Sequence, residues 1–300
     1  MKNIHLYLSL CLLFGISYSL HSQEIKIFTT EDFDLIDSVK TNVVVTKYGK
    51  ESYEFNPDGR LVKSTTKYND ADYSITYYKY DADYLVEKRF ENYRDNVFDV
   101  NTSIANFYAI DSVPNLKITE RVVDYNKQLL EQYEYAYNDK NLLDNIVKTT
   151  DNGIDKTVIT YQSYKGENTK TYTKNGEIVK SIRTSTVKEK DTVLKKVVLT
   201  KTYLKGKPVS AKEAVYSKQQ QLLSVTTFIQ DAESNEFNVQ ELKVYTYDEK
   251  NIVQKTETTI GEDTLIHTYI YQFDNGDSGN WVKQIITPDN TYTTREITYY

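Results

Sequence analysis

The chain has 300 residues, of which 39% are hydrophobic and 27% charged, and its 43 acidic and 37 basic side chains give a net charge of −6. A net acidic chain is not typical of a nucleic-acid-binding protein, which displays a clustered basic surface, nor has it the polybasic segment that holds a protein on an anionic membrane. The single cysteine, Cys11, excludes an intramolecular disulfide and a cysteine-rich metal site.

Residues 1–22 have the order of a secretory signal peptide. A positive residue near the start is followed by an apolar run over 4–16 and then by small residues. This order predicts export, with the mature chain beginning at Gln23 or at Leu20. A lipid anchor on Cys11 is disfavoured, because most of the apolar run lies after that residue. The predicted location is the periplasm, the outer surface or the exterior.

Residues 23–300 are predicted to form one all-β domain of sequential antiparallel β-hairpins. The 28 tyrosines, together with Thr, Val and Ile, suit a pleated surface that is partly covered. Polar and apolar residues alternate with a period of two in 243–247, 267–273 and 295–300. Polar clusters that favour turns, such as 56–59, 138–141 and 248–251, recur about every 10 to 15 residues.

Two stretches depart from this alternation. Thr30 is a candidate N-cap for a short helix that reaches about Val39. Residues 101–116 have the poorest periodicity and are predicted to be a long connection. The remaining strands are expected to form an extended or curled twisted sheet, and the sequence leaves open whether that sheet closes.

The hairpins repeat one pattern, aromatic-x-aromatic-Asp/Asn, a turn, and an apolar pair followed by Lys. Clear copies occupy 53–63, 78–88 and 245–255, and a fourth copy over 271–283 has additional turn residues. One such unit cannot bury both of its faces alone, so neighbouring units are expected to stack.

At these residues the chain resembles the YD-repeat, or RHS-like, family of secreted bacterial proteins. The Tyr-Asp pairs are Tyr80-Asp81 and Tyr247-Asp248, and Gly279-Asn280-Trp281 and the terminal 295–300 also look like small exported members of that group. The resemblance implies an antiparallel β-repeat that is sometimes wrapped into a shell and often linked to carbohydrate or cell-surface contact. Many copies here lack the turn glycine of the family pattern, and the chain is short for a shell around a cargo domain.

Few residues carry a recognisable chemistry. His267 is the one histidine left after removal of 1–22, and its place in an alternating strand predicts a structural role rather than membership of a Ser-His-Asp triad. Phosphate-binding and dinucleotide-binding motifs are absent from the sequence, so no cofactor is predicted. Asp274 and Asp277 lie in an oxygen-rich turn of the kind that can hold Ca²⁺. A plain hairpin turn is preferred, because no Glu follows at the twelfth position of an EF-hand loop.

The densest aromatic cluster is the candidate binding site. It comprises Trp281, Tyr269, Tyr271, Tyr245 and Tyr247, whose rings could stack on sugars or anchor a protein; cross-strand packing is the structural alternative.

The leading hypothesis is therefore a secreted, non-enzymatic binding or scaffold protein with a glycan or cell-surface protein as partner. A carboxylate-dependent glycoside hydrolase and a structural component or accessory of a toxin or secretion system are the alternatives.

Overall fold

The computed structural model describes residues 25–189, 192–231, 233–275 and 278–300; the predicted signal peptide lies outside them. These residues form one antiparallel sheet preceded by a short 3-10 turn, which confirms the all-β prediction. In the first half the elements are η1 (Thr30–Phe33), β1 (Val39–Thr46), β2 (Gly49–Phe55), β3 (Leu61–Lys67), β4 (Tyr73–Asp81), β5 (Tyr84–Arg94), β6 (Val97–Phe98), β7 (Ile104–Asp111), β8 (Lys117–Asp124), β9 (Leu129–Tyr137) and β10 (Leu143–Thr150). The second half contains β11 (Gly153–Tyr164), β12 (Glu167–Lys174), β13 (Glu177–Glu189), β14 (Thr192–Leu204), β15 (Lys207–Ser217), β16 (Leu222–Gln230), β17 (Phe237–Tyr247), β18 (Val253–Ile260), β19 (Asp263–Asn275), β20 (Ser278–Thr287) and β21 (Thr291–Tyr299). Within the described part of the chain, no helix has the length and apolarity that a bilayer crossing needs.

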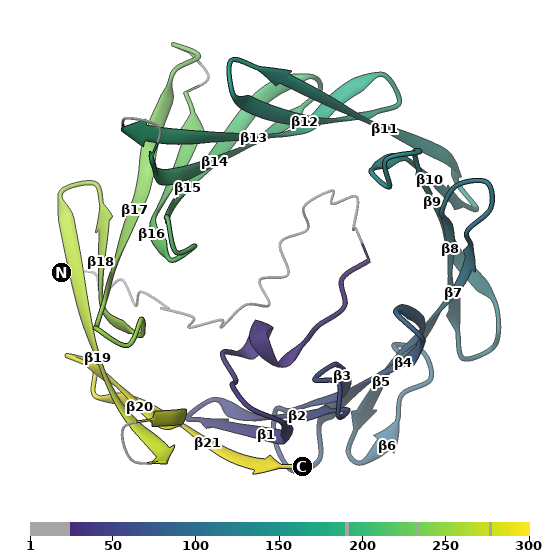
Figure 1. Ribbon diagram of the computed structural model, residues 1–300. Helices are drawn as coiled ribbons and strands as arrows, with labels where there is room; N and C mark the ends of the chain where they lie inside the picture. Colours follow the sequence, from purple (N-terminus) through teal and green to yellow (C-terminus); the bar gives the residue numbers. More distant parts are fainter. Residues whose placement is uncertain (1–24, 190–191, 232, 276–277) are drawn as a thin grey trace, which may run out of the picture.

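The sheet closes on itself. Neighbours along the chain pair antiparallel, except that β6 extends only the end of β5 and β5 pairs onward with β7. The first strand, β1, pairs with β2 on one side and with β21 on the other, where Val44 lies opposite Arg295. The result is a 20-stranded barrel, seen in Figure 1 as a ring of hairpins. Closure thus answers the question that the sequence leaves open.

A short segment inside the ring identifies the inner face of the strands. Residues 25–38, which we call the strap, precede β1 and lie within the ring in Figure 1. Phe28 of the strap packs against Tyr78, and Phe33 packs against Tyr53. The strand residues on the same face as Tyr53 and Tyr78 therefore point into the lumen, and their immediate neighbours along each strand point outward.

The core consists of two clusters on this inner face. The first joins Leu35 of the strap to Val39, Val44, Tyr53, Phe55 and Leu61. The second lies on β8–β12 around Ile118, Tyr135, Leu143, Ile146, Ile159 and Tyr172, and Ile25 packs against it. The strap therefore contacts two separate parts of the barrel wall.

In several repeat units the Asp or Asn builds the turn that follows the aromatic pair. Oδ1 of Asp248 accepts hydrogen bonds from the backbone N–H groups of Lys250 and Ile252, at 2.9 Å each. Asn251 of the same turn has a φ of 65°, a left-handed conformation that Asn tolerates well. Asn138 makes the equivalent pair of bonds in the turn between β9 and β10. A short polar side chain at this position therefore satisfies the turn backbone without any need for glycine.

Tyrosine hydroxyls of the repeat connect neighbouring units. The hydroxyls of Tyr80, Tyr161 and Tyr247 donate to the carbonyls of Leu61, Leu143 and Leu222, respectively, at 2.7, 2.9 and 2.8 Å. Each of these leucines lies at a shift in strand register, where a β-bulge disrupts the ladder of backbone hydrogen bonds. The hydroxyl thus supplies a donor where the ladder is interrupted.

The predicted N-terminal helix is shorter than expected. It is a 3-10 turn from Thr30 to Phe33, capped by Thr29 rather than by Thr30. Asp34 ends it in the left-handed conformation, with a φ of 51°. The chain bends again at Asp37, which has a φ of 64°, and Val39 already belongs to β1.

The predicted long connection over 101–116 is wrong, because these residues contain β7 (Ile104–Asp111). The strand pairs with β5 and β8. Ala105 and Ala109 of this strand point outward, and Asn106 points inward. The outward positions are therefore not more polar than the inward ones. Alternation is therefore weak in the sequence although the strand is regular.

Candidate ligand-binding lumen

The barrel is too wide for its own side chains to fill. Strands about 4.8 Å apart with a tilt of about 40° give a backbone radius of about 20 Å for a barrel of this strand number. Tyr161 faces inward and is nevertheless 40% exposed, and the inward-facing Lys212 is also exposed. Water therefore reaches the lumen wall.

The repeat places its tyrosines on this wall. Strand register puts Tyr135, Tyr172, Tyr216, Tyr245, Tyr247, Tyr269 and Tyr271 on the lumen face. Their positions follow from the aromatic-x-aromatic spacing, because residues two apart on a strand share a face. The predicted shared face of His267, Tyr269, Tyr271 and Phe273 is thus observed, and it is the inner one.

Trp281, Tyr269 and Tyr271 form one continuous aromatic row. The rings of Tyr269 and Tyr271 lie 6.4 Å apart and nearly parallel, and the centroid of Trp281 is 6.0 Å from that of Tyr271. The guanidinium carbon of Arg295 is 3.4 Å from the Trp281 centroid, so a cation covers part of the indole. Burial lowers the pKa of Arg295 to about 10 and raises that of Tyr271 to about 12. The row is therefore partly packed into the wall.

Tyr245 and Tyr247 lie two strands away from this row. Burial raises the pKa of both phenols. The hydroxyl of Tyr247 is already bonded to Leu222, whereas the ring of Tyr245 has the ammonium of Lys243 5.4 Å from its centroid. The structure thus gives Tyr247 a clear packing role and leaves Tyr245 beside a cation on the lumen wall.

Asn280, which belongs to the Gly-Asn-Trp motif, holds the strap. Its side chain is 2% exposed, accepts a hydrogen bond from the Ile36 N–H at 2.8 Å and donates to the Ile36 carbonyl at 2.9 Å. Arg295 adds a second contact by donating to the carbonyl of Phe33 at 3.0 Å. Sequence reasoning does not find this role, because the partners lie at opposite ends of the chain.

At the candidate Ca²⁺ site, the protein itself uses the carboxylate of Asp274. The Asp274 carboxylate accepts hydrogen bonds from the backbone N–H of Asn280, at 3.0 Å, and from the Tyr299 hydroxyl. Asp277 lies outside the described residues. Among the residues that are described, no group of three or more His, Cys, Asp or Glu side chains could hold a metal ion.

His267 is 9% exposed and lies opposite Thr256 in the sheet. Its Nε2 is 3.3 Å from Oδ2 of Asp289. Neither a serine hydroxyl nor a cysteine thiol bonds to this ring within the described structure. In the described structure the His267–Asp289 pair thus has no nucleophile in contact with it.

Glu120 is a carboxylate that the wall has enclosed. It accepts hydrogen bonds from Asn106, Tyr108 and Tyr135, at 2.6, 3.0 and 2.7 Å. Burial, and then the charge of Glu120, raise the pKa of Tyr135, whereas burial lowers the pKa of the nearby Lys88. Three donors thus satisfy the hydrogen-bonding capacity of the Glu120 carboxylate within the wall.

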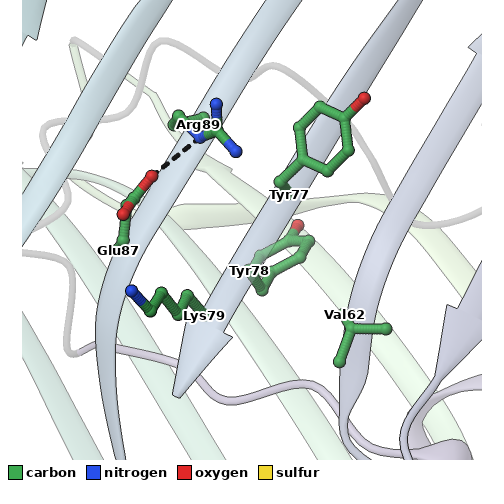
Figure 2. A pocket seen from close by; sticks show the side chains of 6 residues that line it. All are labelled: Val62, Tyr77, Tyr78, Lys79, Glu87 and Arg89. Atoms are coloured by element: carbon green, nitrogen blue, oxygen red, sulfur yellow. Dashed lines mark ion pairs between the residues drawn. The ribbon is translucent and has the colours of Figure 1, made fainter. Parts of the chain in front are cut away.

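A small hollow of about 270 Å³ lies at β3–β5 (Figure 2) and is lined by Val62, Tyr77, Tyr78, Lys79, Glu87 and Arg89. Arg89 lies over the ring of Tyr77, 5.1 Å from its centroid, and its Nε is 2.7 Å from Glu87. The register places Tyr77, Glu87 and Arg89 on the outer face. Glu87 and Arg89 pair with each other on the outer face, whereas Tyr78 of the same hollow faces the lumen.

No protein-family model and no curated protein matches the chain, so the YD-repeat resemblance stays a prediction. Among solved structures, a porin-like protein from Bacteroides uniformis is similar at 11% identity and a TM-score of 0.32, over 87% of this chain and 98% of that one. A porin-like protein from Bacteroides vulgatus is similar at 11% identity and a TM-score of 0.26, over 88% and 99% of the two chains. TM-scores this low do not establish a shared function.

Proposed function

We propose that the chain is an exported, non-enzymatic barrel that binds a glycan in its lumen. The observation that carries this proposal is the inward orientation of the repeat tyrosines along a wall that water reaches. A phenol ring presents an apolar face to a sugar ring, and its hydroxyl can exchange hydrogen bonds with sugar hydroxyls.

The charged residues on the outer face of the barrel favour a barrel that is surrounded by water. Register places Lys50, Ser52 and Glu54 of β2 outward, and Glu87 and Arg89 of β5 likewise. A lipid-facing barrel carries an apolar band there, and a Lys or Arg near the bilayer midplane costs about 2–4 kcal/mol. Charged residues on successive outward positions therefore favour the periplasm, the outer surface or the exterior over insertion in a bilayer.

The proposal assigns no reaction to the protein. The enclosed carboxylate of Glu120 is used by three neighbouring donors, and His267 pairs with Asp289. A glycosidase needs a proton donor and a second carboxylate that both reach the substrate, and neither residue is arranged in this way.

A matched pair of tyrosines tests the proposal. Tyr245 faces the lumen and Tyr292 faces outward, and each has a lysine ammonium 5.4 Å from its ring centroid. Mature protein would be screened on a glycan array, and the best glycan would then be titrated by calorimetry. We expect Tyr245→Ala to weaken binding about tenfold, or about 1.4 kcal/mol, and Tyr292→Ala to leave it unchanged. Absence of any glycan binding, or an equal loss in both variants, would refute lumenal binding.

A further inference from the structure

One side of the lumen is lined with lysines. Strand register places Lys170, Lys180, Lys196, Lys212 and Lys243 on the inner face of β12–β17, and we call this set the lysine strip. Among the described residues of these strands, Glu241 is the carboxylate that the register places on the inner face among the lysines, opposite Thr227. The strip is thus a positive surface within a chain whose net charge is −6.

Two other lysines of the lumen wall pair with carboxylates, in contrast to three lysines of the strip in the described structure. Lys148 lies 2.7 Å from Glu131, and Lys174 lies 2.8 Å from Asp155. Within the described chain, no ion pair joins Lys196, Lys212 or Lys243 to a carboxylate. Their positive charges are therefore available to a ligand.

The lysines of the strip are spread out rather than clustered at one point. Lys196 and Lys212 lie on adjacent strands, four residues apart in register, and Lys212 and Lys243 lie two strands apart. Strand spacing and rise per residue place their Cα atoms about 12–14 Å from each other. Such spacing suits a long ligand with repeated negative charges better than one small anion.

The ammonium groups cover the aromatic rings of the strip. Nζ of Lys196 is 5.6 Å from the centroid of Tyr216, and Nζ of Lys243 is 5.4 Å from that of Tyr245. Each of these pairs places a cation beside a phenol hydroxyl, and these groups bind carboxylates and sugar hydroxyls.

The strap packs against β1–β4 and also reaches the strands of the strip, with Ile25 in the cluster that includes Tyr172 of β12 and Asp34 near Tyr247 of β17. Its described residues pack against β1–β4 through Phe28, Phe33 and Leu35, and against the cluster on β8–β12 through Ile25. In Figure 1 the strap runs through the interior of the ring to β1, and β13–β17 lie on the side of the ring away from β1.

We propose that the lysine strip binds an acidic polysaccharide, one whose sugar units carry carboxylates or similar anionic groups. This inference rests on the proposed function and specifies its ligand. The charges hold the chain along β12–β17, while the tyrosine hydroxyls contact the sugars between the charged units.

Two charge-matched variants test the strip. Lys196→Gln/Lys212→Gln/Lys243→Gln removes three lumenal charges, whereas Lys156→Gln/Lys201→Gln/Lys283→Gln removes three outward ones. Mature wild-type and variant proteins would be titrated by calorimetry with sodium polygalacturonate, with neutral dextran and with a single-stranded oligothymidylate. Thermal melting would verify that both variants remain folded.

We expect polygalacturonate to bind best, with an affinity that falls as salt screens the charges. The lumenal triple variant should lose about tenfold or more in affinity and the outward variant about twofold or less. Equal binding of dextran and polygalacturonate, unaffected by the lumenal variant, would overturn the inference while the proposed function stands. Tighter oligothymidylate binding, or equal loss in both variants, would also overturn it. Binding of neither polysaccharide, when another glycan binds on the array, would overturn the inference alone; no glycan binding at all would overturn both.

Discussion

Removal of the Asn280 side chain should weaken the attachment of the strap to the barrel near Ile36. The amide makes three hydrogen bonds: from the Ile36 N–H at 2.8 Å, to the Ile36 carbonyl at 2.9 Å and to the Tyr299 hydroxyl at 2.9 Å. Because Asn280 is 2% exposed, water does not readily replace these bonds. At about 1 kcal/mol for each bond, Asn280→Ala should lower the free energy of unfolding by about 3 kcal/mol.

The assay is thermal melting of the mature protein, combined with amide hydrogen exchange. For a chain of this size, 1 kcal/mol corresponds to about 2–4 °C in Tm, so the expected decrease is about 6–12 °C. The Ile36 amide should also exchange faster in the variant. Asn152→Ala, in the exposed turn between β10 and β11, is the control and should leave Tm unchanged. If Asn280→Ala and Asn152→Ala have the same Tm, the strap is not held by Asn280 and the reasoning is refuted.

Two further predictions concern tyrosine hydroxyls. Tyr247→Phe should lower the free energy of unfolding, measured by chemical denaturation, by about 1 kcal/mol, because the Leu222 carbonyl loses its donor. The control Tyr164→Phe changes a ring that is 64% exposed and should leave the free energy of unfolding unchanged. Equal decreases in both variants would contradict the proposed link between repeat units. Burial raises the pKa of Tyr80 and Tyr271 to about 12, so their stabilising contribution should be complete below the ordinary value of 10 and be lost as the pH rises through 12. In an ultraviolet titration, Tyr271→Phe should have one phenol fewer than the wild type among those that titrate near pH 12. If the missing phenol is instead one that titrates near pH 10, this assignment is contradicted.

The local features of the fold could be predicted from the sequence because they depend on neighbouring residues. Period-two alternation places Tyr269 and Tyr271 on one face, and the Asp after Tyr247 builds its turn through bonds to residues two and four positions later. Where alternation is blurred, as around Ala105 and Asn106, the same reasoning missed a strand.

Closure and the anchoring of the strap could not be predicted, because both depend on residues from opposite ends of the chain. In the sequence Asn280 is only a member of the Gly-Asn-Trp motif, yet its partner is Ile36. Arg295 was placed on the correct alternating face, but nothing local indicated that it would cover Trp281. Likewise, the lysines of the strip come from different hairpins, and only the register of β12–β17 brings them onto one wall.

The pairing of β1 with β21 also constrains how the molecule can be assembled. Those strands come from the two ends of the domain, and joining the ends of a loop of about 250 residues costs about 5 kcal/mol of chain entropy. An emerging chain can form its early hairpins in order, but its first strand keeps an unpaired edge until the last strand arrives. The Thr41 and Thr298 hydroxyls, 2.6 Å apart across this junction, can meet only then. Truncation of the final strand would therefore leave two open edges, which are templates for association with other chains.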